Sequence, residues 1–185
     1  DYAINWASAQ GYLCSAMWEM TYRCNERCVH CFNPGAAHSP DQKPNRNTDE
    51  LSFEEAKQLL DELHEAGVFK LTLSGGEVFV RKDFMDIVAH ARGLGMQVNI
   101  YTNGLLLSEA RLQQLCDLWP ETVSISIYST DPLKHDQVTN VIGSYETSVE
   151  ALKRLHAAGI KTQIKTPLMG STVDGFMDVA DLAKE

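Results

Sequence analysis

The chain has 185 residues, of which 44% are hydrophobic and 22% are charged, and its formal net charge is −9. This composition is typical of a globular protein with one substantial hydrophobic core, and the chain is short for two domains. The acidic balance argues against nucleic acids and anionic membranes as partners, because the sequence builds no basic patch. No apolar run approaches the ~20 residues that a membrane-spanning helix needs.

The cysteine pattern indicates the cellular compartment of the protein, and the two ends of the chain indicate its extent. Five cysteines, three of them within eight residues, do not form a disulfide framework, so we expect a cytoplasmic protein. Residues 1–6 have neither the basic start nor the apolar stretch of a signal peptide. The chain starts without Met, and residues 174–185 form an amphipathic helical pattern without a cap, which predicts a piece of a longer protein.

Strands and helices alternate along the chain, starting with a strand at about 16–20. A polar stretch with three prolines follows at 33–50 and predicts a long loop. The later strands are predicted at 68–74, 97–101, 123–128 and 160–166. The helices between them are predicted at 53–66, 84–92, 108–118 and 144–158, with Ser52, Ser108 and Ser144 as N-caps.

This alternation predicts an α/β fold with a parallel sheet, because each helical crossover returns the chain to the same end of the sheet. In parallel α/β barrels the functional groups lie on the loops at the carboxyl ends of the strands. The chemically distinctive segments of this chain occur at those positions. They are the cysteine-rich loop after the first strand, then residues 74–77, 102–104, 126–129 and 165–167 at the ends of the next four.

Cys24, Cys28 and Cys31 form the pattern Cys-x3-Cys-x2-Cys, and no fourth cysteine follows nearby. Three thiolates on one loop can hold three irons of a 4Fe–4S cluster and leave the fourth iron open to a substrate or cofactor. A structural zinc site usually needs four ligands, which neither Cys14, ten residues upstream, nor Cys116, within a helical pattern, completes. The pattern therefore favours an iron–sulfur cluster, with zinc or a reduced group of thiols as the alternatives.

Small and polar residues at two other strand ends could serve a bound ligand. Gly75 and Gly76 would let a ligand approach the backbone, and Glu77 can accept hydrogen bonds from an ammonium group. An ordinary strand-to-helix turn with a solvated Glu is the alternative. Thr102 and Asn103 either bind a carboxylate or form a turn.

The last two strands contribute weaker candidates. Ser124 and Ser126 alternate with isoleucines, so both lie on one face of their strand and need hydrogen-bond partners if that face is buried. Lys165 is either a catalytic residue or a surface lysine. His135 and Asp136 are either active-site groups or a helix-start pair in a surface loop.

Four segments of the chain resemble the radical S-adenosylmethionine (radical SAM) superfamily. They are residues 18–32 with the three cysteines, residues 73–77 with Gly-Gly-Glu, residues 101–104 and residues 123–129. The resemblance runs from about Met17 to the end. It implies a partial (β/α)6 TIM-like barrel, truncated here after about five strands, with residues 1–15 as an N-terminal segment and residues 16–185 as the core domain. In that family three cysteines hold a 4Fe–4S cluster, and SAM chelates the fourth iron through its methionyl amine and carboxylate.

Carried onto this sequence, the resemblance implies the cluster ligands Cys24, Cys28 and Cys31. It also implies contacts with SAM: Gly75, Gly76 and Glu77 with the methionyl amine, His30 near the adenine, and Thr102, Asn103 and Ser126 with the methionyl carboxylate and the ribose. The chain departs from the family at Val78, where Pro is common, and at Tyr128, where many relatives have Asp. The first departure concerns loop shape, and the second leaves the ribose contact there open.

Residues 128–145 are similar to the peptide- and protein-modifying branch of the superfamily, whose members often carry a SPASM or twitch extension with auxiliary iron–sulfur clusters. The resemblance implies an enzyme that reductively cleaves SAM to a 5′-deoxyadenosyl radical, which removes hydrogen from a ribosomally made peptide or protein. Auxiliary clusters would lie beyond this chain. The implied partners are the substrate and an electron donor such as flavodoxin or ferredoxin.

Two alternatives stay open. A maturase of a small-molecule cofactor of the haem, quinone or molybdopterin type would use the same chemistry, and the substrate would then not be a peptide. A non-catalytic iron–sulfur module would normally supply four protein ligands to its cluster, so the three-cysteine pattern argues against it.

Overall fold

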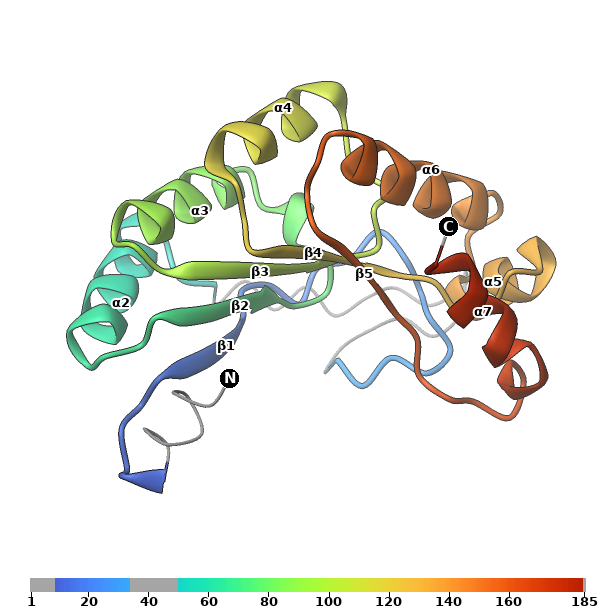
Figure 1. The fold of residues 1–185 in the computed structure, drawn as a ribbon, viewed down its shortest axis with the longest axis horizontal. Coiled ribbons are helices and arrows are strands. Elements are labelled where there is room, and N and C mark those ends of the chain that lie inside the picture. The colour runs from blue at the N-terminus through green and yellow to red at the C-terminus, as the bar shows by residue number, and fades with distance from the viewer. Residues whose placement is uncertain (1–8, 34–49, 185) are drawn as a thin grey trace.

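The computed structural model describes residues 9–33 and 50–184, so the long loop predicted at 33–50 lies almost entirely outside the described residues. A parallel sheet with the strand order β1-β2-β3-β4-β5 forms the centre of the molecule (Figure 1). The strands are β1 (Ser15–Glu19), β2 (Lys70–Ser74), β3 (Gln97–Thr102), β4 (Thr122–Ser126) and β5 (Thr162–Lys165). Each strand pairs in parallel with the next one in sequence, which confirms the predicted α/β class.

The crossover helices line one face of the sheet (Figure 1). They are α2 (Phe53–Glu65), α3 (Phe84–Gly93), α4 (Glu109–Leu118) and α6 (Ser144–Ala157). Helices collect on one face when successive crossovers share the same hand, and the sheet then curves away from them. The sheet is open within the described part of the chain, because β1 and β5 are its two edges.

Two shorter helices, α5 (Pro132–Thr139) and α7 (Phe176–Leu182), lie near the end of the sheet toward which the strands point (Figure 1). Two 3-10 turns, η1 (Val78–Val80) and η2 (Val173–Gly175), complete the described elements. Among these elements, none is a helix long and apolar enough to cross a bilayer.

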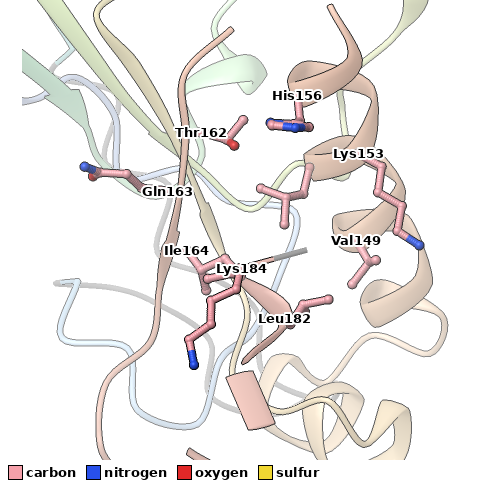
Figure 2. A pocket seen from close by; sticks show the side chains of 10 residues that line it. Val149, Lys153, His156, Thr162, Gln163, Ile164, Leu182 and Lys184 are labelled. Carbon is pink, nitrogen blue, oxygen red and sulfur yellow. The ribbon is translucent and has the colours of Figure 1, made fainter. Parts of the chain in front are cut away.

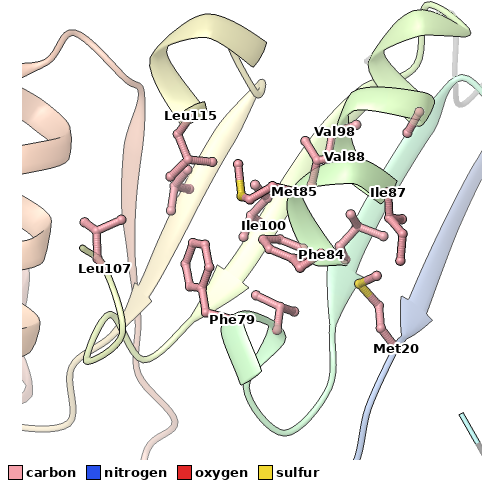
Figure 3. Close-up of a cluster of buried hydrophobic side chains, with 14 of the residues drawn as sticks. Met20, Phe79, Phe84, Met85, Ile87, Val88, Val98, Ile100, Leu107 and Leu115 are labelled. Carbon is pink, nitrogen blue, oxygen red and sulfur yellow. The ribbon is translucent and has the colours of Figure 1, made fainter. Parts of the chain in front are cut away.

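The hydrophobic core fills the space between the sheet and its helices. Figure 3 shows Phe84 and Val88 of α3 against Val98 and Ile100 of β3, and all four are at most 1% exposed. Phe79 of η1 joins this core, with its ring centroid 5.1 Å from that of Phe84. Because η1 directly follows residues 74–77, the core fixes the end of that loop.

Two of the three predicted N-caps are confirmed. Ser52 and Glu55 form a reciprocal capping box at the start of α2, and the Ser108 side chain accepts a hydrogen bond from the amide of Arg111 in α4. The third prediction is wrong. Gly143, with φ of 79°, occupies the N-cap of α6, while Ser144 is buried inside the first turn.

The connection between β4 and α6 contains a helix, whereas the sequence left His135 and Asp136 as either active-site groups or a helix-start pair in a surface loop. His135 and Asp136 belong to α5, and His135 is fully buried. Asp136 accepts hydrogen bonds from the Gly143 amide (2.6 Å), the Ser144 hydroxyl (2.8 Å) and the Tyr145 amide (3.0 Å). Its carboxylate therefore replaces the missing cap and joins α5 to the N-terminus of α6.

We expect Asp136→Ala to lower the free energy of unfolding by about 2 kcal/mol, because two amides in the first turn of α6 lose their acceptor. Burial alone would raise the pKa of Asp136, but its three hydrogen bonds outweigh burial and lower the pKa. The carboxylate thus stabilises the fold above its unfolded pKa, and this contribution is lost as pH falls through the lower folded pKa.

Urea unfolding of the wild type and the variant between pH 7 and pH 3 measures this contribution. The difference should be constant near neutrality and shrink below about pH 4. Asp117→Ala is the control, because Asp117 is exposed and its carboxylate accepts a hydrogen bond from the Gln113 side chain one turn earlier in its own helix. A difference that is absent at pH 7, or equal for the two variants, would contradict the capping role.

Candidate active site

A cavity of about 520 Å³ lies at the carboxyl ends of the strands, between the cysteine loop and the sheet. Nine of the ten residues that the sequence predicted for the cluster and SAM line it: Cys24, Cys28, His30, Cys31, Gly75, Gly76, Thr102, Asn103 and Ser126. Of the three catalytic candidates, Lys165 lines the cavity and His135 and Asp136 do not. The fold thus brings together groups from the ends of β1 to β5.

The start of the cysteine loop packs directly on the two glycines after β2. The Gly76 amide donates to the carbonyl of Thr21 (2.7 Å), and the Glu77 amide donates to the carbonyl of Arg23 (2.9 Å). A Cβ atom on Gly75 or Gly76 would overlap the backbone of Thr21 or Arg23, and Gly75 has a φ of 145°. The glycines are therefore required by loop packing, and they line the cavity with main chain only.

The middle of the cysteine loop is held by the C-terminus of α5. The amides of Arg27 and Val29 donate to the carbonyls of Thr139 (3.0 Å) and Val138 (2.9 Å). The side chain of Asn140, at φ of 55°, donates to the carbonyl of Arg27 (2.8 Å). The two amide bonds satisfy carbonyls that a helix end leaves without partners, and all three bonds fix the loop on either side of Cys28.

Glu77 is turned away from the cavity. Its carboxylate is fully buried and accepts hydrogen bonds from the amide of Phe79 (3.0 Å), the hydroxyl of Thr102 (2.7 Å) and the amide of Asn103 (2.8 Å). Burial raises the pKa of Glu77 although these bonds oppose the shift. The Glu77 carboxylate thus joins the loop after β2 to the end of β3, and its contact with an ammonium group stays a prediction.

Asn103 links the same strand end to the cysteine loop. Its side-chain amide donates to the side-chain oxygen of Asn25 (2.8 Å), and its own oxygen accepts from the amide of Leu105 (3.0 Å). Asn103 thus forms the turn that was one of its two alternatives, and its side chain also ties the end of β3 to the cysteine loop.

The thiols of Cys24 and Cys28 sit in a poorly solvated environment. Burial raises the pKa of Cys24 to about 12, and burial together with the Glu26 carboxylate raises the pKa of Cys28 still further. The Cys28 thiol donates to Glu26 Oε2 (3.2 Å) and lies 3.9 Å from the hydroxyl of Tyr128. Thiols of this kind remain protonated until a cation displaces the proton.

The three thiols border one cavity. Cys24, Cys28 and Cys31 all line it, and an iron–sulfur cluster takes each cysteine thiolate on a different iron. The cavity, at about 520 Å³, is within the usual size range of small-molecule sites. This donor set therefore fits a 4Fe–4S cluster with three protein ligands.

Several lining residues were not singled out as site residues from the sequence. Glu26 and Tyr101 line the cavity, and the Lys165 ammonium lies 4.6 Å from the centre of the Tyr101 ring. The sequence feature that could have identified Glu26 as a site residue is its position between two predicted cluster ligands. For Tyr101, that feature is its position at the end of a predicted strand. Ser124, the other serine on the face of Ser126, is buried and bonds to Gln163 (3.3 Å).

A second cavity of about 430 Å³ lies between α6, β5 and α7 (Figure 2). Val149, Ile164 and Leu182 line it, together with Thr162 and His156. Its lining includes no cysteine and no carboxylate, and it shares no residue with the cavity at the strand ends. Its lining combines these apolar side chains with the amine-bearing side chains of Lys153 and Lys184.

The family model of the Radical SAM superfamily matches residues 18–183. The chain belongs to the radical SAM superfamily. The predicted resemblance is thereby confirmed over nearly the whole chain. Membership also accounts for the order of the segments that border the cavity, from the three cysteines after β1 to Ser126 at the end of β4.

Two curated relatives show the range of proteins that this radical SAM chain resembles. It is 30% identical over 168 residues to an AdoMet-dependent heme synthase from Methanosarcina barkeri, covering 91% of this chain and 46% of that protein. It is 32% identical over 167 residues to the mycofactocin maturase MftC from Mycolicibacterium smegmatis, covering 90% of this chain and 40% of MftC. The chain thus spans less than half the length of these relatives.

The fold is similar to that of SuiB from Streptococcus suis. The structure of SuiB bound to S-adenosylmethionine superposes with a TM-score of 0.78 at 15% identity, covering 97% of this chain and 40% of SuiB. SuiB bound to its precursor peptide SuiA superposes with a TM-score of 0.76 at 15% identity, covering 98% of this chain and 39% of SuiB. The likeness confirms the predicted partial TIM-like barrel, present here as an open sheet of five strands.

We expect Gly76→Ala to lower the free energy of unfolding by about 1–3 kcal/mol, because the added methyl group meets the Arg23 backbone, which cannot move aside cheaply. The control is Gly93→Ala at the end of α3, where an added Cβ meets nothing within 4 Å. Alanine there should be neutral or slightly stabilising. Urea unfolding monitored by circular dichroism measures both, and equal stability of the two variants would contradict the packing role.

Proposed function

We propose that this chain is the core of a radical SAM enzyme that modifies a ribosomally made peptide or protein. One observation supports the proposal above the others: the three thiols of one short loop and the main chain of Gly75 and Gly76 border a single cavity at the strand ends. A site with three thiol ligands and adjoining polar groups is suited to a cluster that must also bind a small molecule.

Cys24, Cys28 and Cys31 would hold a 4Fe–4S cluster, and the polar groups of Thr102 and Ser126 would contact SAM. When bound, the cluster supplies the electron that cleaves SAM to a 5′-deoxyadenosyl radical, which abstracts hydrogen from the substrate. The protein's part is to position these groups and keep the cavity poorly solvated. Three separate anchors hold the loop to the sheet and to α5: Gly76, Asn103 and the C-terminus of α5.

The remaining residues of the site fall into two groups. His30 packs edge-on against Tyr128, with ring centroids 4.8 Å apart, and this contact holds the His30 ring at the cavity, where it can pack against a purine. Lys165 brings a positive charge from the end of β5 to the same cavity. We assign His30 to the adenine and Lys165 to the substrate side, where a cation attracts an acidic group.

The peptide class is supported by two of the relatives. MftC is described as a mycofactocin maturase, and SuiB has been crystallised with its precursor peptide. A small-molecule substrate is the second candidate, because the heme synthase is equally similar over the same part of the chain. In either case we place the protein in the cytoplasm, since its five cysteines are unpaired thiols, with a flavodoxin or ferredoxin as the electron donor.

Anaerobic reconstitution of the full-length protein with iron and sulfide, followed by dithionite and SAM, tests the chemistry. Wild type should form 5′-deoxyadenosine. Cys28→Ala should reduce the rate of its formation by more than about 100-fold, because removing a cluster ligand lowers activity more than removing a residue that only supports a ligand. Cys116→Ala is the matched control, since Cys116 lies in α4 outside the cavity. Wild type without 5′-deoxyadenosine, or equal loss in both variants, would overturn the proposal.

The substrate class has its own experiment. The reconstituted enzyme is incubated with SAM and either a precursor peptide encoded beside its gene or an iron tetrapyrrole, and the products are analysed by mass spectrometry. We expect the peptide to lose hydrogen and 5′-deoxyadenosine to accumulate in parallel. Turnover of the tetrapyrrole alone would replace the peptide proposal with the cofactor-maturase one.

A further inference from the structure

Tyr128 faces a predicted cluster ligand. It follows β4 directly, lines the main cavity and is only 8% exposed. Its hydroxyl oxygen lies 3.9 Å from the sulfur of Cys28, within hydrogen-bonding distance for a sulfur acceptor. This contact joins residues that are 100 positions apart in sequence, so the fold alone creates it.

The ring of Tyr128 is held in place from both sides. The His30 ring packs edge-on against it at 4.8 Å between centroids, and the His135 ring lies at 5.3 Å on a tilted plane. The Tyr128 amide also donates to Nδ1 of His135 (3.2 Å). Because His135 is fully buried in α5, the direction of the Tyr128 side chain is set by packed neighbours rather than by solvent.

Helix α5 positions both partners of this contact. It carries His135 against Tyr128, and its C-terminus accepts the amides of Arg27 and Val29 on either side of Cys28. Donor and acceptor are thus fixed to the same short element. Such a hydrogen bond keeps its geometry when the charge on the sulfur changes.

We propose that Tyr128 donates a hydrogen bond to the Cys28 thiolate of the bound cluster and thereby raises the reduction potential of that cluster. This inference rests on the proposed function. A donor to a ligand sulfur stabilises the reduced cluster more than the oxidised one, because the reduced cluster carries one more negative charge. Another oxygen facing Cys28, Oε2 of Glu26 at 3.2 Å, accepts a hydrogen bond from the thiol in this structure.

His135 is a positioning residue in this arrangement. It touches neither the cysteines nor the cavity, and it acts by orienting Tyr128. The sequence named His135 as a candidate catalytic residue, and the present inference gives it a positioning role through Tyr128, a position where many relatives have Asp.

The test is the midpoint potential of the reconstituted cluster in the full-length protein, measured by a redox titration followed by electron paramagnetic resonance. Tyr128→Phe should shift the potential to a more negative value. At the wild-type midpoint, its ratio of reduced to oxidised cluster should fall by about threefold to tenfold, and tenfold corresponds to 59 mV for one electron.

Tyr101→Phe is the matched control. It removes another phenol hydroxyl from the same cavity but keeps the ring beneath Lys165, and no bond from Tyr101 to a cysteine exists in the described structure. Its potential should equal that of wild type. Iron and sulfide content is measured for every variant, so that potentials are compared only between fully loaded proteins.

A third protein keeps the inference testable if Tyr128→Phe does not take up the cluster. Site-specific 3-fluorotyrosine at position 128 keeps the shape of the ring and makes the hydroxyl a stronger donor, so the potential should move in the opposite direction, above wild type. An unchanged potential in loaded Tyr128→Phe, or in the fluorinated protein when Tyr128→Phe does not load, overturns the inference alone. A wild-type protein that takes up no cluster overturns the proposed function as well.

Discussion

The site depends on the close contact between the cysteine loop and the two glycines after β2. Two backbone hydrogen bonds, from Gly76 to Thr21 and from Glu77 to Arg23, hold the loop against the sheet. They require the two main chains to approach so closely that no Cβ fits between them. This contact determines where the loop leaves β1, and therefore on which side of the sheet the three thiols lie.

Helix α5 extends this constraint to the other side of the cavity. Its eight residues receive the middle of the cysteine loop at one end, hold the N-terminus of α6 through Asp136, and orient Tyr128 through His135. Neither Asp136 nor His135 needs to reach the substrate for this role. A short element with several buried hydrogen bonds gives the rigid support that a cofactor site requires.

Electrostatics give the cysteine loop two distinct states. With no cation present, burial raises the pKa values of Cys24 and Cys28, so both thiols are neutral and the cavity avoids unpaired negative charge. Cys24 and Cys28 would hold bound iron as thiolates, so metal binding would release both protons. The hydroxyl of Tyr128 is the neutral donor that suits both states, because it can face a thiol or a thiolate.

The sequence by itself determined the alternation of strands and helices, the capping box at Ser52 and the set of residues at the strand ends, because these follow from local periodicity and short motifs. It also carried a signal for α5 that the prediction missed, Asp131 before Pro132 at the first turn. Only the tertiary structure decided the direction of Glu77 and the true reason for the glycines. Both depend on partners from distant segments, Thr102 and Asn103 in one case and Thr21 and Arg23 in the other, and no local pattern encodes those contacts.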